Sequence, residues 1–381
     1  MENGRAQRIA IASVFAALFF VMGLHLPYWP VWLQARGLSP EQIGILLALG
    51  PWVRVVANPM AGRIADRTGR PRRLGQCLAV GVLVTYAGFA WTEGFFALAV
   101  LSIVLGAAFS PLIPLTDTIA MRAVGARGGY GQLRSWGSGA FIAASVVGGA
   151  LLSDGTEDRI LWSLVAASTV LALSTILLPR VSTVADASES MTRRSERSIS
   201  RTPILVWFLV ASTLLHATHA MLYGFGTAHW RSVGVDEPTI GWLWAVGVIA
   251  EIGLFTVGTS VLRRLSPAKL LALSGIGGIV RWSALATTTA VLPLFAAQAL
   301  HGLTFAALHL GAIELIRAKF PDARAAQVNG LYSAASGVAL GIGLPLSGWL
   351  YGVWQGGTYL VMAAISALGV LASVRLARAC A

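Results

Sequence analysis

The chain has 381 residues, of which 56% are hydrophobic and 12% are charged, and its formal net charge is +12. This apolar content exceeds what a soluble core of that size can bury, so we expect a membrane protein. The positive charge calls for no nucleic acid partner, because cytoplasmic loops of membrane proteins are rich in Lys and Arg and face anionic lipid. The two cysteines, Cys77 and Cys380, lie in separate parts of the chain, and we expect no disulfide framework.

Apolar runs of about 20 residues, the length of helix that crosses a bilayer, recur along the whole chain. They form two groups of six, and the expected spans are 9–33, 42–62, 74–92, 95–121, 134–153, 160–179, 203–229, 239–262, 270–289, 291–316, 328–351 and 358–376. The first run is too long for a cleaved signal segment, so we expect it to remain as the first helix.

These runs predict an all-α integral membrane protein with twelve transmembrane helices in two pseudo-symmetric six-helix bundles. We place the N-terminal bundle at residues 1–179 and the C-terminal bundle at residues 203–381. Residues 180–202 between them are rich in serine and in charge, which indicates a solvated cytoplasmic linker.

The positions of the 28 Lys and Arg residues predict the orientation. Nearly all of them lie on the face that carries the two termini and the linker. The opposite face has only Arg36, Arg159 and Arg231, and two more, Arg54 and Arg281, lie inside spans. Because basic loops stay on the cytoplasmic side, we expect both termini to be cytoplasmic in a multi-pass protein of the inner (plasma) membrane.

A repeat relates the two groups of spans. Residues 43–54 recur with substitutions as residues 240–251, and the alignment places Arg54 opposite Glu251. Each charge falls near the middle of an apolar span, where an ionised side chain costs about 2.5–3.5 kcal/mol on insertion scales. A duplicated membrane half with charge at mid-depth favours a transporter.

The loop between the second and third spans, residues 62–73, reads Gly-Arg-Ile-Ala-Asp-Arg-Thr-Gly-Arg-Pro-Arg-Arg. It resembles the G-x-x-x-D-R/K-x-G-R-R/K signature of the major facilitator superfamily, with a proline before the final basic pair as its one departure. The resemblance implies the major facilitator fold and a latch in which Asp66 and Arg70 hold the two halves in the outward-open state. The final basic pair fits equally well as positive-inside charge. The expected latch residues are Gly62, Asp66, Arg67, Gly69 and Arg70.

Four further segments resemble the phenylpropionate-permease-like branch of that superfamily, which is distantly similar to lactose permease. They are residues 26–30, 130–138, 219–225 and 300–305. The resemblance covers nearly the whole chain. It implies a secondary transporter that works by alternating access, and it leaves the substrate open.

Only three acids lie within the expected spans, namely Asp117, Glu251 and Glu314. Glu251 is the one near the middle of a span, where burial disfavours the ionised carboxylate and a nearby arginine favours it. We therefore expect Glu251 to carry the coupled proton, with Arg281 and His301 beside it. A static ion pair that fixes helix packing is the alternative.

His301 occupies the place of a functional histidine in lactose permease, one turn before that protein's proton-carrying glutamate. Here the glutamate position is Thr304 and the lysine before the histidine is Gln298. The lactose-permease proton site is therefore not carried over whole, which leaves Glu251 as the expected replacement.

The expected substrate-binding residues are cations, imidazoles and phenols on helices that would face a central cavity. Asp117 and Arg134 resemble the acid and arginine that grip substrate hydroxyls in lactose permease, although both would also suit a gate at the cytoplasmic ends. The aromatic and histidine residues would equally fit helix packing. The full set is Arg54, Asp117, Arg134, His25, Tyr28, His219, Tyr223 and His309.

Together these features predict a proton-coupled symporter of a small organic solute, with an aromatic or aliphatic carboxylate preferred because cations and imidazoles outnumber acids. A sugar or nucleoside symporter, a drug or metabolite efflux antiporter, and a non-transporting membrane sensor are the alternatives. We expect no enzyme activity, no cofactor and no metal site, since the sequence lacks a P-loop and an H-E-x-x-H motif. The expected partners are the small-molecule substrate, protons and the lipid bilayer, with the monomer as functional unit.

Overall fold

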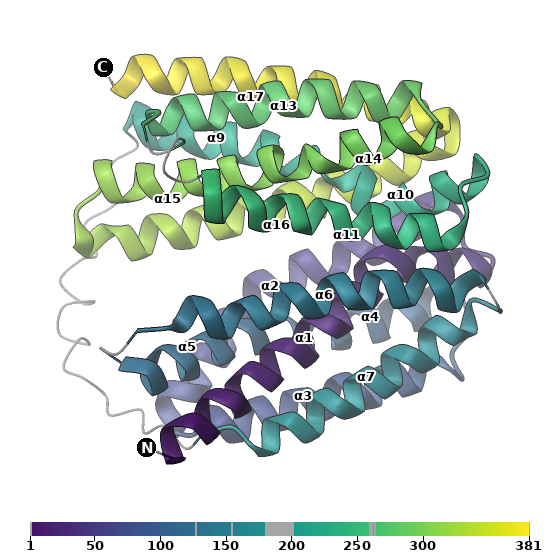
Figure 1. Ribbon diagram of the computed structural model, residues 1–381, viewed down its shortest axis with the longest axis vertical. Coiled ribbons are helices and arrows are strands. Elements are labelled where there is room, and N and C mark those ends of the chain that lie inside the picture. The colour runs from purple at the N-terminus through teal and green to yellow at the C-terminus, as the bar shows by residue number, and fades with distance from the viewer. Residues whose placement is uncertain are drawn as a thin grey trace.

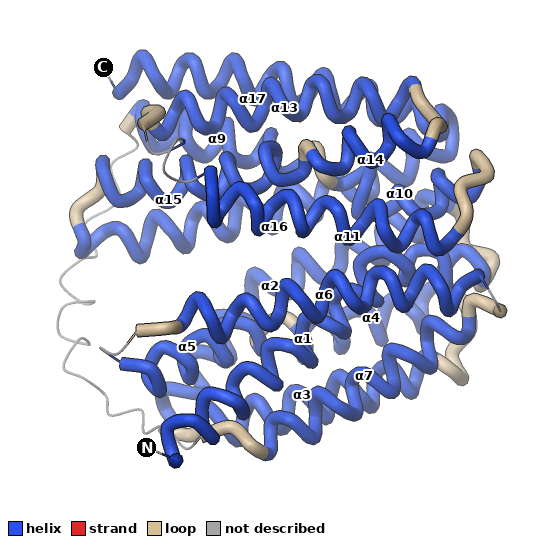
Figure 2. Tube along the Cα trace, viewed as in Figure 1, coloured by secondary structure: helices blue, strands red, loops and turns tan. Residues whose placement is uncertain are grey.

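The computed structural model describes residues 2–125, 128–153, 155–179, 202–258, 262 and 264–380. Within these ranges every regular element is a helix (Figure 2). Ten helical stretches are long and apolar enough to span a membrane, and the last of them, Gln327–Cys380, contains two helices. The helix Pro71–Phe89, which begins with charged residues, completes the set of twelve. The predicted fold class is confirmed, whereas the linker at 180–201 lies outside the described residues.

The N-terminal bundle consists of six transmembrane segments, the fourth of which is made of two helices. They are α1 (Glu2–Ala35), α2 (Pro40–Thr68), α3 (Pro71–Phe89), α4 (Phe95–Phe109) with α5 (Leu112–Val124), α6 (Tyr130–Ser153) and α7 (Asp158–Ile176).

The C-terminal bundle has the same plan with more interruptions. Its segments are α9 (Pro203–Ala217) with α10 (Ala220–Ser232), α11 (Glu237–Gly253) with a π-helical turn at Leu254–Gly258, α13 (Pro267–Thr287), α14 (Val291–Ala299) with a π-helical turn at Gly302–Ala307 and α15 (Leu308–Lys319), α16 (Asp322–Trp354), and α17 (Thr358–Cys380).

Three runs that look continuous in the sequence are broken in the structure. The breaks fall between α4 and α5, between α9 and α10, and around the π-helical turn that follows α14. Proline at position 111 explains the first, because it lacks the N–H that a continuing helix requires. The other two breaks present His219 and His301 near mid-span, where discontinuous helices of transporters usually form their binding sites.

The repeat-related helices α2 and α11 begin with side-chain caps. The Ser39 hydroxyl accepts a hydrogen bond from the Gln42 N–H, and the Gln42 Oε1 accepts one from the Ser39 N–H. Asp236 accepts from the Thr239 N–H at 2.9 Å. Each cap satisfies backbone donors that the first helical turn leaves open, so both helices start at defined residues.

The two bundles meet mainly along two helix pairs, α2 with α16 and α6 with α11, and α1 also contacts α10 (Figure 1). Glycines permit the close approach: a Cβ atom at Gly44 would lie 2.6 Å from the carbonyl oxygen of Leu344, and one at Gly241 would lie 2.7 Å from that of Ser145. Across the same end of the molecule the Arg231 Nη1 lies 3.2 Å from the Glu157 Oε1. The end opposite the termini is therefore closed by direct contact between the bundles.

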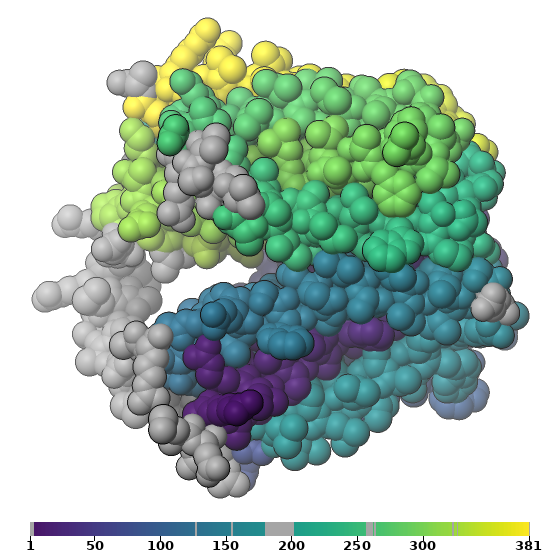
Figure 3. Space-filling view, in the orientation of Figure 1, coloured from purple at the N-terminus to yellow at the C-terminus, as the bar shows by residue number. Residues whose placement is uncertain are grey.

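Toward the other end the bundles separate. Figure 3 shows a hollow between them at the end where Figure 1 places the N and C termini. The structure is thus a carrier-like fold that is sealed at one end and open at the end of the termini.

Candidate functional site

The hollow leads into a central cavity of about 950 Å³ between the bundles. Its wall combines one arginine from α2 with imidazole and aromatic rings from the C-terminal bundle. They include Arg54, His216, His219, Tyr223, Phe305 and His309. No Asp or Glu occurs among the described residues that line this cavity, so its polar surface is neutral or positive.

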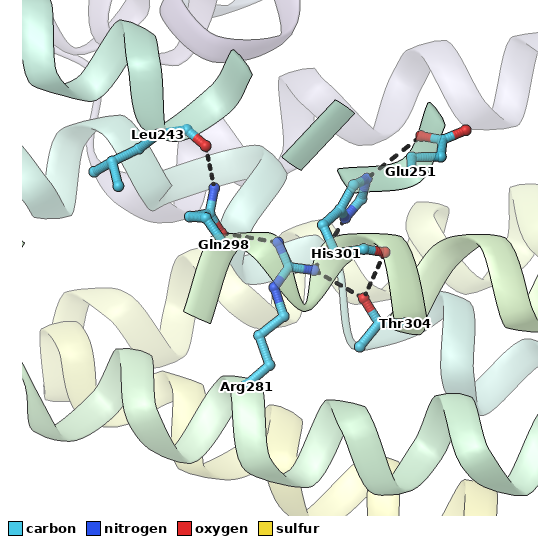
Figure 4. A network of polar contacts seen from close by, with 6 residues as sticks. All are labelled: Leu243, Glu251, Arg281, Gln298, His301 and Thr304. Atoms are coloured by element: carbon cyan, nitrogen blue, oxygen red, sulfur yellow. Dashed lines mark hydrogen bonds and ion pairs between the residues drawn. The ribbon is translucent and has the colours of Figure 1, made fainter. Parts of the chain in front are cut away.

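A polar network lies in the C-terminal bundle behind this cavity, centred on Arg281 of α13 (Figure 4). Arg281 is fully buried. It donates to the Gln298 Oε1 at 2.8 Å, to the Thr304 Oγ1 at 2.9 Å and to the His301 Nδ1 at 3.0 Å. The three acceptors come from the segment that follows α13, in which α14 is followed by a π-helical turn. The break in this segment brings the three side chains around the guanidinium.

The acceptors in this network are themselves held in place. The Gln298 Nε2 donates to the Leu243 carbonyl of α11 at 3.1 Å, which fixes the amide with its oxygen toward Arg281. Because a guanidinium can only donate, His301 accepts through Nδ1, and the proton of its neutral ring is on Nε2.

The His301 Nε2 faces Glu251, whose Oε2 lies 3.9 Å away (Figure 4). The side chain of Glu251 is 24% exposed and that of His301 is 11% exposed. The structure thus brings together the three residues predicted for proton coupling, and it arranges them in a chain. No ion pair joins Glu251 directly to Arg281 in the part of the chain that the structure describes.

Asp117 and Arg134 form a second cluster, within the N-terminal bundle. The Arg134 Nε lies 3.8 Å from the Asp117 Oδ1, and Tyr130 donates to the same oxygen at 2.8 Å. The guanidinium also lies 4.1 Å from the ring centre of Phe19. The two predicted residues therefore meet, but neither is among the described residues that line the central cavity. Tyr130 was not predicted, although it begins one of the segments that carry the family resemblance.

His25 lies in a side pocket of about 240 Å³ in the N-terminal bundle, whose wall also includes Arg54. Its Nδ1 is 2.9 Å from the Tyr86 hydroxyl, and its ring stacks on Trp29. Tyr28, by contrast, is fully buried and donates to the Ser145 carbonyl of α6. Tyr28 thus packs helices together and does not face either of these two spaces.

The predicted residues His219, Tyr223 and His309 all line the central cavity. The His219 ring is 5.7 Å from the His301 ring and 5.7 Å from the Tyr223 ring, measured between centroids. His216, which also lines the cavity, was absent from the predicted set. Its position nearly one helical turn before His219 is the signal that could have identified it.

The segment with the predicted latch, residues 62–73, lies at the open end. The prediction of a loop there was wrong for most of it, because α2 continues to Thr68 and α3 begins at Pro71. Gly69 ends α2 in a left-handed conformation with φ of 64°, which glycine adopts without strain. The proline that departs from the signature occupies the first position of α3, where its missing N–H costs nothing. Asp66 is exposed and makes no ion pair with any residue that the structure describes, so its latch role stays a prediction.

Among the described residues, no group of three or more His, Cys, Asp and Glu side chains is arranged to hold a metal ion.

Comparison with known proteins gives matches along nearly the full length. The model of the MFS_1-like family matches residues 9–362. The chain is 33% identical over 366 residues to a protein of Escherichia coli (strain K12) named "Probable 3-phenylpropionic acid transporter", covering 93% of this chain and 94% of that one. It is 28% identical to the maltose permease of Geobacillus stearothermophilus, covering 98% of this chain and 96% of the permease.

Solved structures of transporters have the same fold. The nucleoside transporter NupG superposes with a TM-score of 0.86 at 17% identity, covering 98% of this chain and 99% of that one. A D-xylose-proton symporter superposes with a TM-score of 0.73 at 14% identity, covering 97% of this chain and 96% of the other. At such low sequence identity these two similarities show the fold alone.

Proposed function

The chain belongs to the MFS_1-like family of major facilitator transporters, and from that premise we propose that it is a proton-coupled symporter of small organic carboxylates, with aromatic acids as its main substrates. The observation that carries the proposal is the central cavity, whose described wall has arginine, imidazole and aromatic rings and no carboxylate. An anion is attracted to such a wall, and a ring can stack against its aromatic side chains. The relative named as a 3-phenylpropionic acid transporter supports the same substrate class.

Glu251 is the proposed proton carrier. Gly241 of α11 packs against Ser145 of α6 at the closed end. If the same contact extended toward the open end, Glu251 of α11 would come close to Arg134 of α6, whose charge is opposite. Closing the open end would bring these opposite charges together, and their attraction would hold that end closed.

This arrangement supports a coupling sequence. Protonation of Glu251 removes the charge that holds Arg134, so the end with the termini opens only when the proton is bound. In the open state Glu251 is partly exposed, and its proton leaves to the solvent on that side. The ionised carboxylate then pairs again with Arg134 as the end closes, which couples one direction of movement to the proton gradient.

A sugar or nucleoside symporter is the second candidate. The side of the cavity formed by α16 presents Asn329, Ser333 and Ser336, whose amide and hydroxyl groups suit a polyhydroxylated ligand. The relative named maltose permease favours this candidate.

Uptake into proteoliposomes separates the two candidates. With an acidic exterior we expect saturable accumulation of radiolabelled 3-phenylpropionate above its level in protein-free liposomes under the same gradient. That control is essential because the neutral acid crosses bilayers unaided. Counterflow, with the same solute labelled outside and unlabelled inside, is then measured for 3-phenylpropionate, benzoate, maltose and adenosine, and its rate ranks the substrate classes. Counterflow of maltose or adenosine, with none of either acid, would refute the carboxylate proposal.

Orientation in the membrane is part of the proposal, with the open end and both termini in the cytoplasm and the protein working as a monomer in the inner membrane. The excess of basic residues near the termini supports it. In a background with Cys77 and Cys380 replaced by serine, a single cysteine between residues 183 and 200 should react only with reagent inside the cell. A cysteine at Gly155 should react only from outside. Labelling of both from one side would contradict this topology.

A further inference from the structure

Arg281 keeps unused hydrogen-bonding capacity in the core of the C-terminal bundle. A guanidinium carries five N–H groups, and His301, Thr304 and Gln298 accept from three of them. The Nε–H is buried and has no acceptor among the described residues. One N–H of Nη2 is also left over. Guanidinium N–H groups that lack an acceptor are available to an anionic oxygen, because hydrogen bonds between ionised groups are among the strong ones.

The charge of Arg281 is also uncompensated. All three of its acceptors are neutral, because His301 accepts through Nδ1 and the others are an amide and a hydroxyl. No carboxylate of the described chain lies within ion-pair distance of it, and Glu251 contacts His301 instead. A fully buried cation without a counter-charge is costly, and an anion that reaches it is bound with corresponding strength.

A small cavity gives access to this cation. It has a volume of about 40 Å³, and its wall includes Arg281, Gln298, His301 and Trp244. That volume holds about two or three water molecules, or the carboxylate end of a larger molecule, but not an aromatic ring. Leu26 and Tyr223 line both this cavity and the central one, so the two spaces adjoin.

We infer that the small cavity is the carboxylate subsite of the transporter, in which Arg281 binds the acid group of the substrate while the ring stays in the central cavity. The inference rests on the proposed carboxylate transport and adds the residue that selects the charge. The ring would lie beside Tyr223, His219 and Phe305, whose rings border the central cavity. Leu26 belongs to α1 of the other bundle, so the bound ligand touches both halves and can influence their movement.

The test compares an acid with its neutral amide. Binding of 3-phenylpropionate and of 3-phenylpropionamide is measured on the purified full-length protein by equilibrium binding and by thermal shift. We expect the wild type to bind the acid at least tenfold more tightly than the amide. Arg281→Gln should weaken acid binding at least tenfold and leave amide binding within about twofold, so that the preference disappears. Arg36→Gln, which removes an arginine at the closed end, should keep the preference.

Two further variants decide the case if Arg281→Gln does not fold. Thr304→Glu keeps the arginine and adds a carboxylate at the position of its present hydroxyl acceptor, so it should also remove the preference for the acid. Arg54→Gln and Arg317→Gln test the two arginines that line the central cavity. Loss of the preference in either of these two variants together with its survival in Thr304→Glu or Arg281→Gln would overturn the inference. Acid transport would then continue to support the proposed function, whereas a wild type that neither binds nor transports any acid would refute both.

Discussion

In the N-terminal bundle Arg54 lines the central cavity, and the other interior arginine, Arg134, has a carboxylate partner, Asp117, at 3.8 Å and is partly exposed. In the C-terminal bundle Arg281 is fully buried and is bound only to neutral acceptors, while the acid of that bundle, Glu251, faces a histidine. The two bundles share a fold and a sequence repeat, yet they place their charges in opposite ways.

The difference indicates a division of roles. An anionic substrate would compete with Asp117 for Arg134, whereas a buried and uncompensated cation gains much from an anion that reaches it. In this open state the carboxylate of Glu251 lies next to a neutral ring, so it can exchange a proton without breaking an ion pair. The C-terminal bundle is therefore the one suited to respond to substrate and proton, and the predictions below challenge that division.

The largest effect is expected from the histidine that separates the two charges. His301→Asn keeps an acceptor near Arg281 but removes the ring N–H that faces Glu251 and holds the carboxylate in place for proton exchange with the solvent. The initial rate of gradient-driven uptake should therefore fall about a hundredfold, the low end for disturbing a group that transfers a proton. The matched change in the other bundle is His25→Asn, whose partner is the Tyr86 hydroxyl. An equal fall in uptake rate in both variants would remove the distinction between the bundles.

An intermediate effect is expected at the loop of the N-terminal bundle. Asp66→Asn should slow transport about tenfold, since one lost conformational contact of about 1.4 kcal/mol corresponds to that factor. Binding of 3-phenylpropionate should change less than twofold, because Asp66 is exposed at the end of α2 and does not line the described cavities. Parallel loss of binding and transport would instead make Asp66 a ligand contact.

A smaller effect is expected at the paired charges of the N-terminal bundle. Asp117→Asn should lower the free energy of unfolding by less than about 1 kcal/mol, because the ion pair with Arg134 is partly exposed and such pairs are weak. Thermal unfolding in detergent, compared with the wild type, measures this. A loss well above that figure would contradict the assignment of this ion pair as partly exposed.

The most local effect concerns the caps of the two repeat-related helices. The hydrogen bond from the Thr239 N–H holds the pKa of Asp236 below its usual range. Its contribution to stability is therefore complete above the ordinary Asp pKa of about 4 and is lost as the pH falls through the lowered value. Asp236→Ala should weaken the start of α11 by about 1 kcal/mol.

Hydrogen exchange of the first turns of α11 and α2 checks this prediction. Exchange at the start of α11 should rise in acid, while the start of α2, which Ser39 caps with a hydroxyl, should not respond. The same acid response at both helices would show that the carboxylate is not the cause.

Most of the fold could be predicted from the sequence, because lipid demands long apolar helices and basic loops mark one side. The breaks within the helices could not be predicted. Hydropathy does not indicate whether a helix continues through residues such as Thr218 or Leu300, and π-helical turns have the same apolar composition as the α-helices around them. These breaks are local backbone events that depend on packing in the finished bundle.

The sequence predicted which residues form the site better than it predicted how they are arranged. Charge inside apolar spans pointed to Glu251 and Arg281, and the resemblance to lactose permease pointed to His301. Only the structure places the imidazole between the two charges. Gln298 and Thr304 were noticed as departures from lactose permease, and the structure makes both of them acceptors for Arg281. Tyr28 could not be separated from a cavity residue by sequence, because an aromatic side chain fits packing and binding equally well.

The central claim is that Glu251 carries the proton that drives carboxylate transport, and Glu251→Gln tests it most directly because glutamine imitates the protonated acid. Uptake of radiolabelled 3-phenylpropionate into proteoliposomes is measured with and without an imposed pH gradient, beside counterflow with substrate on both sides. Glu157→Gln, at the closed end, serves as the matched control. The account predicts that Glu251→Gln loses accumulation against the gradient and retains counterflow. Full gradient-driven accumulation by Glu251→Gln would contradict it.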